Sequence, residues 1–261
     1  TAPATAGTYV VKLTPASVGS SGALQGATAQ TLTITVTTAA SLDTVATSAT
    51  IVLNKGETSS ATSDDTVTGS KTTSATAVGT IKTTLKNAAA VATTGESYTA
   101  TISGPGILGA VADASVAPRA TATGRALTVK NGDIVAVYPD GTSGVATVTI
   151  SSKAGVVLGS KTVTFFGTAA SISATVAKTV IGATSAETTK VLTVVVKDAA
   201  GVSVSNLANK IGVVSSDTTK ISTAYTPTST YDATTGTYSV AVTGVAVGSA
   251  NLTVTTNSSS T

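Results

Sequence analysis

Apolar and polar residues alternate along much of this chain, in short runs separated by turn residues. The run LTITVT at 32–37 places an apolar residue at every second position, and VATVTI at 145–150 does so after its first residue. A period of two sends successive side chains to opposite faces of a strand. Runs of this kind predict strands at 9–13, 31–37, 50–53, 97–103, 134–138, 145–150, 162–166, 191–196, 238–242 and 252–255.

Turn residues separate these runs, and helical periodicity is nearly absent. The segments NGD at 131–133 and PDG at 139–141 have the composition of turns. Residues 81–92 favour one short helix, although paired threonines weaken it. No apolar run reaches about 18 residues, so the sequence predicts no transmembrane helix.

The composition supports an all-β chain with thin cores. Hydrophobic residues make up 41% of the 261 residues, but aromatic residues only 3%, and Cys, Met, Trp and His are absent. Thr and Val are plentiful, and their β-branched side chains suit a half-buried pleated surface. The length allows two ordinary domains and part of a third.

A repeated pattern suggests how the domains are arranged. GTYSVAVT at 236–243 is followed by LTVTT at 252–256, and GTYVVKLT at 7–14 is followed by LTITVTT at 32–38. Each copy predicts a hairpin that ends a domain, unless the similarity is a coincidence of Thr/Val-rich sequence. About 40 residues are too few for a sandwich around the first copy.

The predicted organisation follows from this repeat. Residues 1–40 form the terminal hairpin of a preceding or incomplete domain, 41–167 and 168–256 form two sandwiches, and 257–261 form a tail or linker. The polar stretch 57–74 predicts an exposed, mobile loop inserted in the first sandwich. The missing strands of the hairpin lie upstream in a longer chain, or the hairpin completes the sheet of a neighbour.

Two segments resemble a known family. VVVKDAAGV at 194–202 resembles the V-x-D-x-x-G strand and turn of bacterial immunoglobulin-like repeats of the invasin and intimin type, and FFGTAASI at 165–172 resembles the joint between such repeats. The resemblance covers 168–256 best, and 41–167 only in its closing strands and layout. It implies tandem immunoglobulin-like β-sandwich domains with a structural or adhesive role. The chain lacks the proline that often follows the turn, and a core tryptophan.

The charge pattern argues against nucleic-acid binding. Only 10% of residues are charged, and the net charge of +3 comes from 15 basic and 12 acidic residues. The basic residues do not cluster, and no aromatic residues are interleaved with them. Neutral Ser/Thr surfaces repel one another little, so they suit close packing between copies.

The sequence predicts that the protein is not an enzyme. Without His or Cys, no Ser-His-Asp or Cys-His arrangement can form. Glu57, Glu96 and Glu187 are far apart in sequence, and the adjacent Asp64 and Asp65 fall in the predicted loop. Hydrolysis by paired carboxylates would need two converging acids.

No cofactor is required, but calcium is a candidate because it needs only oxygen ligands, and the family resemblance implies calcium between domains. The alternative is that the aspartates bond to their own turns. Asn257, and less favourably Asn251, match the pattern for N-linked glycosylation. An isopeptide bond between Lys178 and Asn251 is a further alternative, without a placed assisting acid. The candidate calcium ligands are Asp64, Asp65, Asp198, Asp217 and Asp232.

Together these observations favour a structural subunit of a bacterial surface layer or surface filament. It would be extracellular, on the bacterial cell surface, and would associate with itself as a homo-oligomer or lattice, with cell-wall or glycan contacts as a further expectation. The alternatives are an adhesin stalk that presents a binding tip elsewhere, and a phage virion decoration protein. The chain starts without Met or a signal peptide, which predicts a processed form or a piece of a longer protein.

Overall fold

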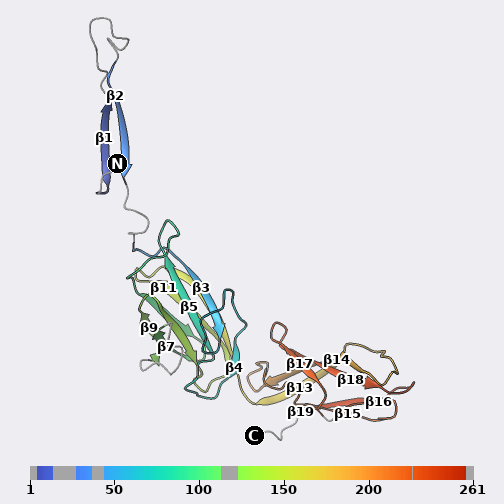
Figure 1. Ribbon diagram of the computed structural model, residues 1–261. Coiled ribbons are helices and arrows are strands. Elements are labelled where there is room, and N and C mark those ends of the chain that lie inside the picture. Colours follow the sequence, from blue (N-terminus) through green and yellow to red (C-terminus); the bar gives the residue numbers. More distant parts are fainter. Residues whose placement is uncertain (1–4, 14–27, 37–43, 113–122, 225, 257–261) are drawn as a thin grey trace.

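The computed structural model describes residues 5–13, 28–36, 44–112, 123–224 and 226–256. In this part of the chain every element is a β-strand, and there is no helix that could cross a membrane. The strands form a separate hairpin followed by two two-layer sandwiches (Figure 1). The prediction of an all-β chain with tandem immunoglobulin-like sandwiches is confirmed.

The first sandwich consists of two five-stranded sheets. One has the order β3-β5-β10-β7-β8, and the other has the order β4-β12-β11-β6-β9. The strands of the first sheet are β3 (Ser48–Lys55), β5 (Gly79–Lys86), β10 (Asp133–Tyr138), β7 (Ile107–Ala112) and β8 (Thr123–Gly124). Those of the second are β4 (Thr68–Ser70), β12 (Val157–Phe166), β11 (Gly144–Ser152), β6 (Tyr98–Ser103) and β9 (Ala126–Val129).

The apolar residues at alternate positions of the strands fill the core between these two sheets. Along β11, Ala146, Val148 and Ile150 are fully buried, while the threonines between them are half-buried. Burying one apolar face of each sheet is the main favourable contribution to such a fold. The closing hairpin pairs β11 with β12, and β12 also pairs in parallel with β4, so β12 lies between two strands.

The second sandwich has two sheets of unequal size. The larger has the order β13-β14-β18-β16, with β17 also paired to β18, and the smaller contains only β15 and β19. Its core includes Val194, Tyr238 and Val240. Its strands are β13 (Ala169–Val176), β14 (Glu187–Asp198), β15 (Ile211–Ser215), β16 (Ile221–Ser222), β17 (Ser229–Asp232), β18 (Thr237–Gly244) and β19 (Leu252–Thr256).

The N-terminal hairpin stands apart from both sandwiches in Figure 1. It pairs β1 (Gly7–Leu13) with β2 (Gln30–Val36) in antiparallel register from Gly7 opposite Val36 to Leu13 opposite Gln30. All its described side chains are exposed except those of Tyr9 and Val36, which are half-buried. The hairpin therefore has no covered face in the described part of the chain.

The ten strands predicted from alternation are all present, but three other predictions are wrong. Residues 81–92 form no helix: β5 covers them as far as Lys86 with alternating burial, because Ile81, Thr83 and Leu85 face the core, and a turn follows. The stretch 57–74 is not wholly an exposed loop, because Val67 is buried and β4 pairs with β12.

The third wrong prediction concerns the repeated pattern. β18 and β19 do not form a hairpin, since β18 pairs with β14, β16 and β17 while β19 pairs with β15. The connection at 245–251 crosses from one sheet to the other. In the first copy, by contrast, β1 and β2 pair along their whole length.

Candidate functional site

A tight turn at residues 198–202, here called the Asp198 turn, follows β14. The Oδ1 atom of Asp198 accepts hydrogen bonds from the amides of Ala200 and Val202, both at 2.9 Å. The amide of Gly201 donates to the carbonyl of Asp198, and Gly201 has a φ of 80°. Such side chain-to-backbone bonds are the usual reason for Asp in turns, and the positive φ explains the glycine.

The other carboxylate oxygen of Asp198 reaches the first sandwich. Oδ2 accepts a 2.7 Å hydrogen bond from the amide of Gly167, and the carboxylate also accepts one from the Ser143 hydroxyl. Asp198 is only 5% exposed. Burial opposes its charge, but the four hydrogen bonds outweigh burial and hold the pKa of the Asp198 carboxyl below its ordinary value.

The two sandwiches meet at this carboxylate, at a short joint. Only Gly167 and Thr168 separate β12 from β13. Phe166 ends β12 of the first sandwich, yet it is buried in the core of the second. A 3.1 Å hydrogen bond between the hydroxyls of Thr68 and Ser205 also crosses the joint. The joint therefore combines apolar burial with fixed polar contacts.

The first sandwich contains the same turn. KNAAAVA at 86–92 corresponds to KDAAGVS at 197–203, and Oδ1 of Asn87 accepts bonds from the amides of Ala89 and Val91. Ala90 has a φ of 60°, as the counterpart of Gly201. The sequence carried this signal, but it was missed because residues 81–92 were interpreted as a helix.

Asp64 and Asp65 fix the segment that precedes β4 through hydrogen bonds to β3 and β12. Asp64 accepts from the amide of Leu53 at 2.9 Å and from Nζ of Lys161 at 2.5 Å, and Asp65 accepts from the amide of Lys55 at 2.8 Å. Burial raises the pKa of Asp64, but the bonds from Lys161 and Leu53 outweigh it and leave the pKa below its ordinary value. These carboxylates therefore stabilise the loop against β3 and β12.

The remaining aspartates predicted as calcium ligands lie in exposed turns. Asp217 accepts from the amide of Thr219 and Asp232 from that of Thr234, both at 2.9 Å. Of the five predicted ligands, only Asp64 and Asp65 lie close to each other. Across the described ranges no group of three or more acidic, His or Cys side chains gathers. Calcium binding stays a prediction.

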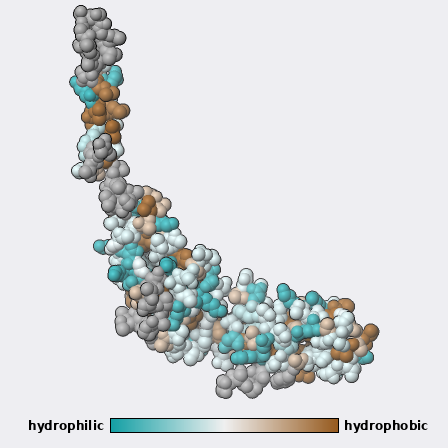
Figure 2. Space-filling view, viewed as in Figure 1, coloured by the Kyte–Doolittle hydropathy of each residue, from teal (hydrophilic) through white to brown (hydrophobic). Residues whose placement is uncertain are grey.

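Apolar side chains gather on the exposed surface of the hairpin, shown in brown in Figure 2. The register places Tyr9 opposite Ile34 and Val11 opposite Leu32, so these four lie on one face of the two-stranded sheet. Leu32 is 55% exposed and Ile34 44%. Apolar faces left open in this way commonly mark sites of protein association.

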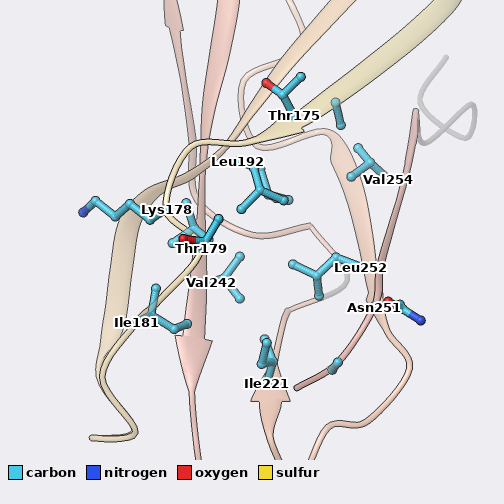
Figure 3. A pocket seen from close by; sticks show the side chains of 14 residues that line it. Thr175, Lys178, Thr179, Ile181, Leu192, Ile221, Val242, Asn251, Leu252 and Val254 are labelled. Atoms are coloured by element: carbon cyan, nitrogen blue, oxygen red, sulfur yellow. The ribbon is translucent and has the colours of Figure 1, made fainter. Parts of the chain in front are cut away.

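A second apolar surface is a groove of about 430 Å³ in the second sandwich (Figure 3). Leu192 and Val242 form its floor, and Leu252, Val254 and Ile181 form its sides. It lies over residues of β14 and β18, between β19 and the segment after β13. The core residues of its floor stay buried, with Leu192 and Val242 each 2% exposed.

Lys178 and Asn251 also line this groove, but their side chains point to opposite sides in Figure 3. Lys178 donates to the carbonyl of Thr189. An isopeptide bond between the two stays a prediction. Asn251 is exposed, while Asn257 lies outside the described residues. Glycosylation of either stays a prediction.

Comparisons with known proteins give structural matches alone, since no protein-family model and no curated protein matches the sequence. Invasin, a bacterial integrin-binding protein, is 19% identical over 80% of this chain and 36% of its own, with a TM-score of 0.29. InvD of Yersinia pseudotuberculosis is 23% identical over 83% of this chain and 54% of its own, with a TM-score of 0.37.

Domains 4–9 of the surface layer protein SbsC are 14% identical over 98% of this chain and 34% of their own, with a TM-score of 0.32. The chain thus spans between about a third and a little over half of these three structures. Such TM-scores mark loose overlays, and the assignment of the sandwiches rests on strand order and register.

Proposed function

We propose that this chain is a structural, non-enzymatic unit of an extracellular bacterial assembly, a surface layer or a surface filament. The observation that carries the proposal is the joint at Gly167, where one sandwich runs into the next with two intervening residues. The Asp198 carboxylate and the buried Phe166 hold this joint together. A protein whose role is to set the spacing of an assembly needs such a stiff connection.

The surface chemistry agrees with close contact between copies. Charged residues make up 10% of the chain, so neighbouring surfaces repel one another weakly. The described acids are mostly engaged in turns and loops, and although Asp64 and Asp65 line one hollow beside Lys161, the described ranges hold no group of three acids. The proposal needs no cofactor, and calcium or glycans would be additions to it.

An adhesin stalk is the second candidate, because a stiff joint also suits a rod that presents a binding tip. The exposed apolar residues of the hairpin suit contacts between copies in an assembly. A phage virion decoration would share every feature with the first proposal, so the source of the protein must separate these two.

Electron microscopy of the purified chain over a range of concentrations tests the proposal. Ordered sheets or filaments are expected, with a spacing that repeats the length of the chain. Parallel samples with calcium and with a chelator show whether assembly depends on the ion. Isolated, extended monomers at every concentration in both samples would favour the stalk and overturn the assembly.

A further inference from the structure

We propose that the segment at 64–70, here called the edge strap, keeps the open edge of β3 in the first sandwich from pairing with a strand of another molecule. The side chains of Asp64 and Asp65 do this by taking the place of a neighbouring strand. The inference concerns a contact that the fold prevents. It therefore does not rest on the proposed function, in which copies meet through other surfaces.

β3 is the outermost strand of its sheet. It pairs with β5 on one side, and no described strand lies on the other. In an antiparallel pair, alternate residues point their backbone groups away from the partner strand. Such unpaired groups are a template for a further strand, and proteins commonly cover them. With eight residues, β3 is longer than the usual strand of about five or six, so its bare edge would be a long template.

Two carboxylates cap the second half of this edge. The amide of Leu53 donates to Oδ1 of Asp64 at 2.9 Å, and the amide of Lys55 donates to Oδ2 of Asp65 at 2.8 Å. The backbone of Asp65 adds a third bond, since its amide donates to the carbonyl of Leu53 at 2.8 Å. Alternate residues of a strand are about 7 Å apart, so two adjacent acids on one segment can reach both amides.

The first half of the edge has no such cap. By the same alternation, Ala49 and Ile51 also point their backbone groups outward. No described residue accepts a hydrogen bond from either amide on that side. Two uncapped residues offer a short template, whereas the four outward residues together would offer one as long as β3 itself. The carboxylates therefore halve the length of edge that is open to another strand.

The edge strap is also fixed to the second sheet. Nζ of Lys161, in β12, lies 2.5 Å from Oδ2 of Asp64, and the Lys161 side chain is only 18% exposed. Further along the strap, β4 pairs with β12 and places Thr68 opposite Thr164. One segment thus covers both edges on this side of the sandwich. Its carboxylates cover β3, and its backbone covers β12.

Carboxylates suit this position because they accept hydrogen bonds and donate none. Each can cap an amide without offering a new donor to an incoming strand. Charge at an edge also opposes the approach of another strand, but Lys161 partly neutralises the charge of Asp64. The protection therefore comes mainly from the hydrogen bonds, and an uncharged acceptor in the same place would also provide it.

Amide hydrogen exchange tests the cap at one position. Asp65→Ala removes the acceptor of the Lys55 amide, and exchange of that amide is expected to speed up by about tenfold or more. Asp65→Asn keeps a side-chain oxygen within reach, so it is expected to change the same rate by less than about threefold. Both variants leave the Asp64–Lys161 pair in place. Slow exchange at Val148, in the central strand β11, shows that the sandwich remains folded.

Removing both carboxylates tests the consequence. The Asp64→Ala/Asp65→Ala chain is expected to self-associate at concentrations about tenfold or more below those that the wild type needs, as measured by sedimentation velocity. In the associated form the amides of residues 49, 51, 53 and 55 should become protected together, because an added strand bonds to all of them. Joint protection of these four amides identifies the edge of β3 as the contact.

Lys55→Pro in the same double-alanine chain is the control for this contact. The amide of Lys55 faces the open edge, so proline removes an outward donor and leaves the bonds between β3 and β5 intact. The concentration needed for association is expected to return to within about threefold of the wild-type value.

Three results would overturn the inference. An unchanged exchange rate of the Lys55 amide in Asp65→Ala would show that the carboxylate does not cap it. A double-alanine chain that associates no more than the wild type would show that the bare edge attracts no strand. Association that persists with Lys55→Pro, without joint protection of the four amides, would place the contact on another surface. Ordered sheets or filaments of the wild type test the proposed function separately.

Discussion

Asn87 and Asp198 occupy the same position of the same turn in successive sandwiches. Each accepts hydrogen bonds through Oδ1 from the amides two and four residues later. They differ in their second polar atom, which is an amide nitrogen in Asn87 and an oxygen in Asp198. That oxygen accepts the Gly167 amide, so the carboxylate serves both the turn and the joint.

The first prediction separates these two roles. Asp198→Asn keeps an acceptor for the turn, as Asn87 shows, but its amide nitrogen cannot accept the hydrogen bond from the Gly167 amide. Leaving a part-buried donor without its partner costs about 1–3 kcal/mol. Denaturant unfolding should show this loss, and small-angle scattering should show a wider range of angles between the sandwiches.

Asp232→Asn is the matched control for this substitution. Asp232 is also a turn aspartate, but it is exposed and bonds within its own turn. It is expected to change neither the scattering nor the angle between the sandwiches. If Asp198→Asn gave the same profile as the control, the joint would not depend on the carboxylate.

The second prediction concerns pH. The folded pKa of Asp198 lies below the ordinary value of 3.8, so its contribution to the free energy of unfolding is present above that value and is lost as pH falls through the folded pKa. Asp64 and Asp140 shift in the same direction, so the wild type alone cannot isolate Asp198. The difference between wild type and Asp198→Asn should therefore stay constant from about pH 5 to 8 and shrink below about pH 4. A difference that grew on acidification would contradict this assignment.

The third prediction uses the two positive-φ residues of the repeated turn. Ala90 has a φ of 60°, a conformation that is strained for a residue with a Cβ, and its counterpart Gly201 has a φ of 80°. Ala90→Gly should stabilise the first sandwich by up to about 1 kcal/mol, and Gly201→Ala should destabilise the second by about 1 kcal/mol. A Cβ on Gly201 would meet nothing within 4 Å, so only backbone strain contributes there.

Thermal unfolding of each variant measures these changes. The two changes in stability are expected to have opposite signs. A general effect of altering the turn would instead destabilise both sandwiches. Stabilisation by Gly201→Ala, or a loss with Ala90→Gly, would show that the backbone of the turn is not strained in the folded protein.

Alternation along the sequence predicted many of the longer strands, because burial of one face leaves a period of two, but it missed β5 and β13, which have eight residues each. It was not sufficient for β4 or β16, because strands of three and two residues are too short to show an alternating pattern. It also could not assign β18 and β19 to sheets. Which sheet a strand joins depends on where its connection crosses, and a pattern of side chains does not record that.

The candidate site was predicted in part for a similar reason. The resemblance at 194–202 identified the Asp198 turn, and turn chemistry accounts for Oδ1. The hydrogen bond from the Gly167 amide to Oδ2 of Asp198 joins residues 31 positions apart and depends on how the two sandwiches meet. The sequence alone does not reveal that contact. Turn chemistry likewise accounts for Asp217 and Asp232, whereas Asp64 is held by Lys161, 97 residues away.

The last prediction compares two tyrosines that begin similar segments. Tyr238 is fully buried, and its hydroxyl donates to the carbonyl of Val204 at 2.6 Å and accepts from the amide of Leu207 at 3.0 Å. Burial raises the pKa of Tyr238 to about 12, so it stays neutral at any ordinary pH. Tyr238→Phe would leave both backbone groups without their partner and should destabilise the second sandwich by about 1–3 kcal/mol.

Tyr9→Phe is the matched change, because the Tyr9 hydroxyl makes one exposed bond to the carbonyl of Thr5. Water can replace that bond, so the expected loss is within about 0.5 kcal/mol. Denaturant unfolding of both variants at neutral pH makes the comparison. Equal losses of stability in the two variants would mean that the segment at 204–207 does not depend on the Tyr238 hydroxyl. They would also mean that burial does not distinguish the two tyrosines of the repeated pattern at 7–14 and 236–243.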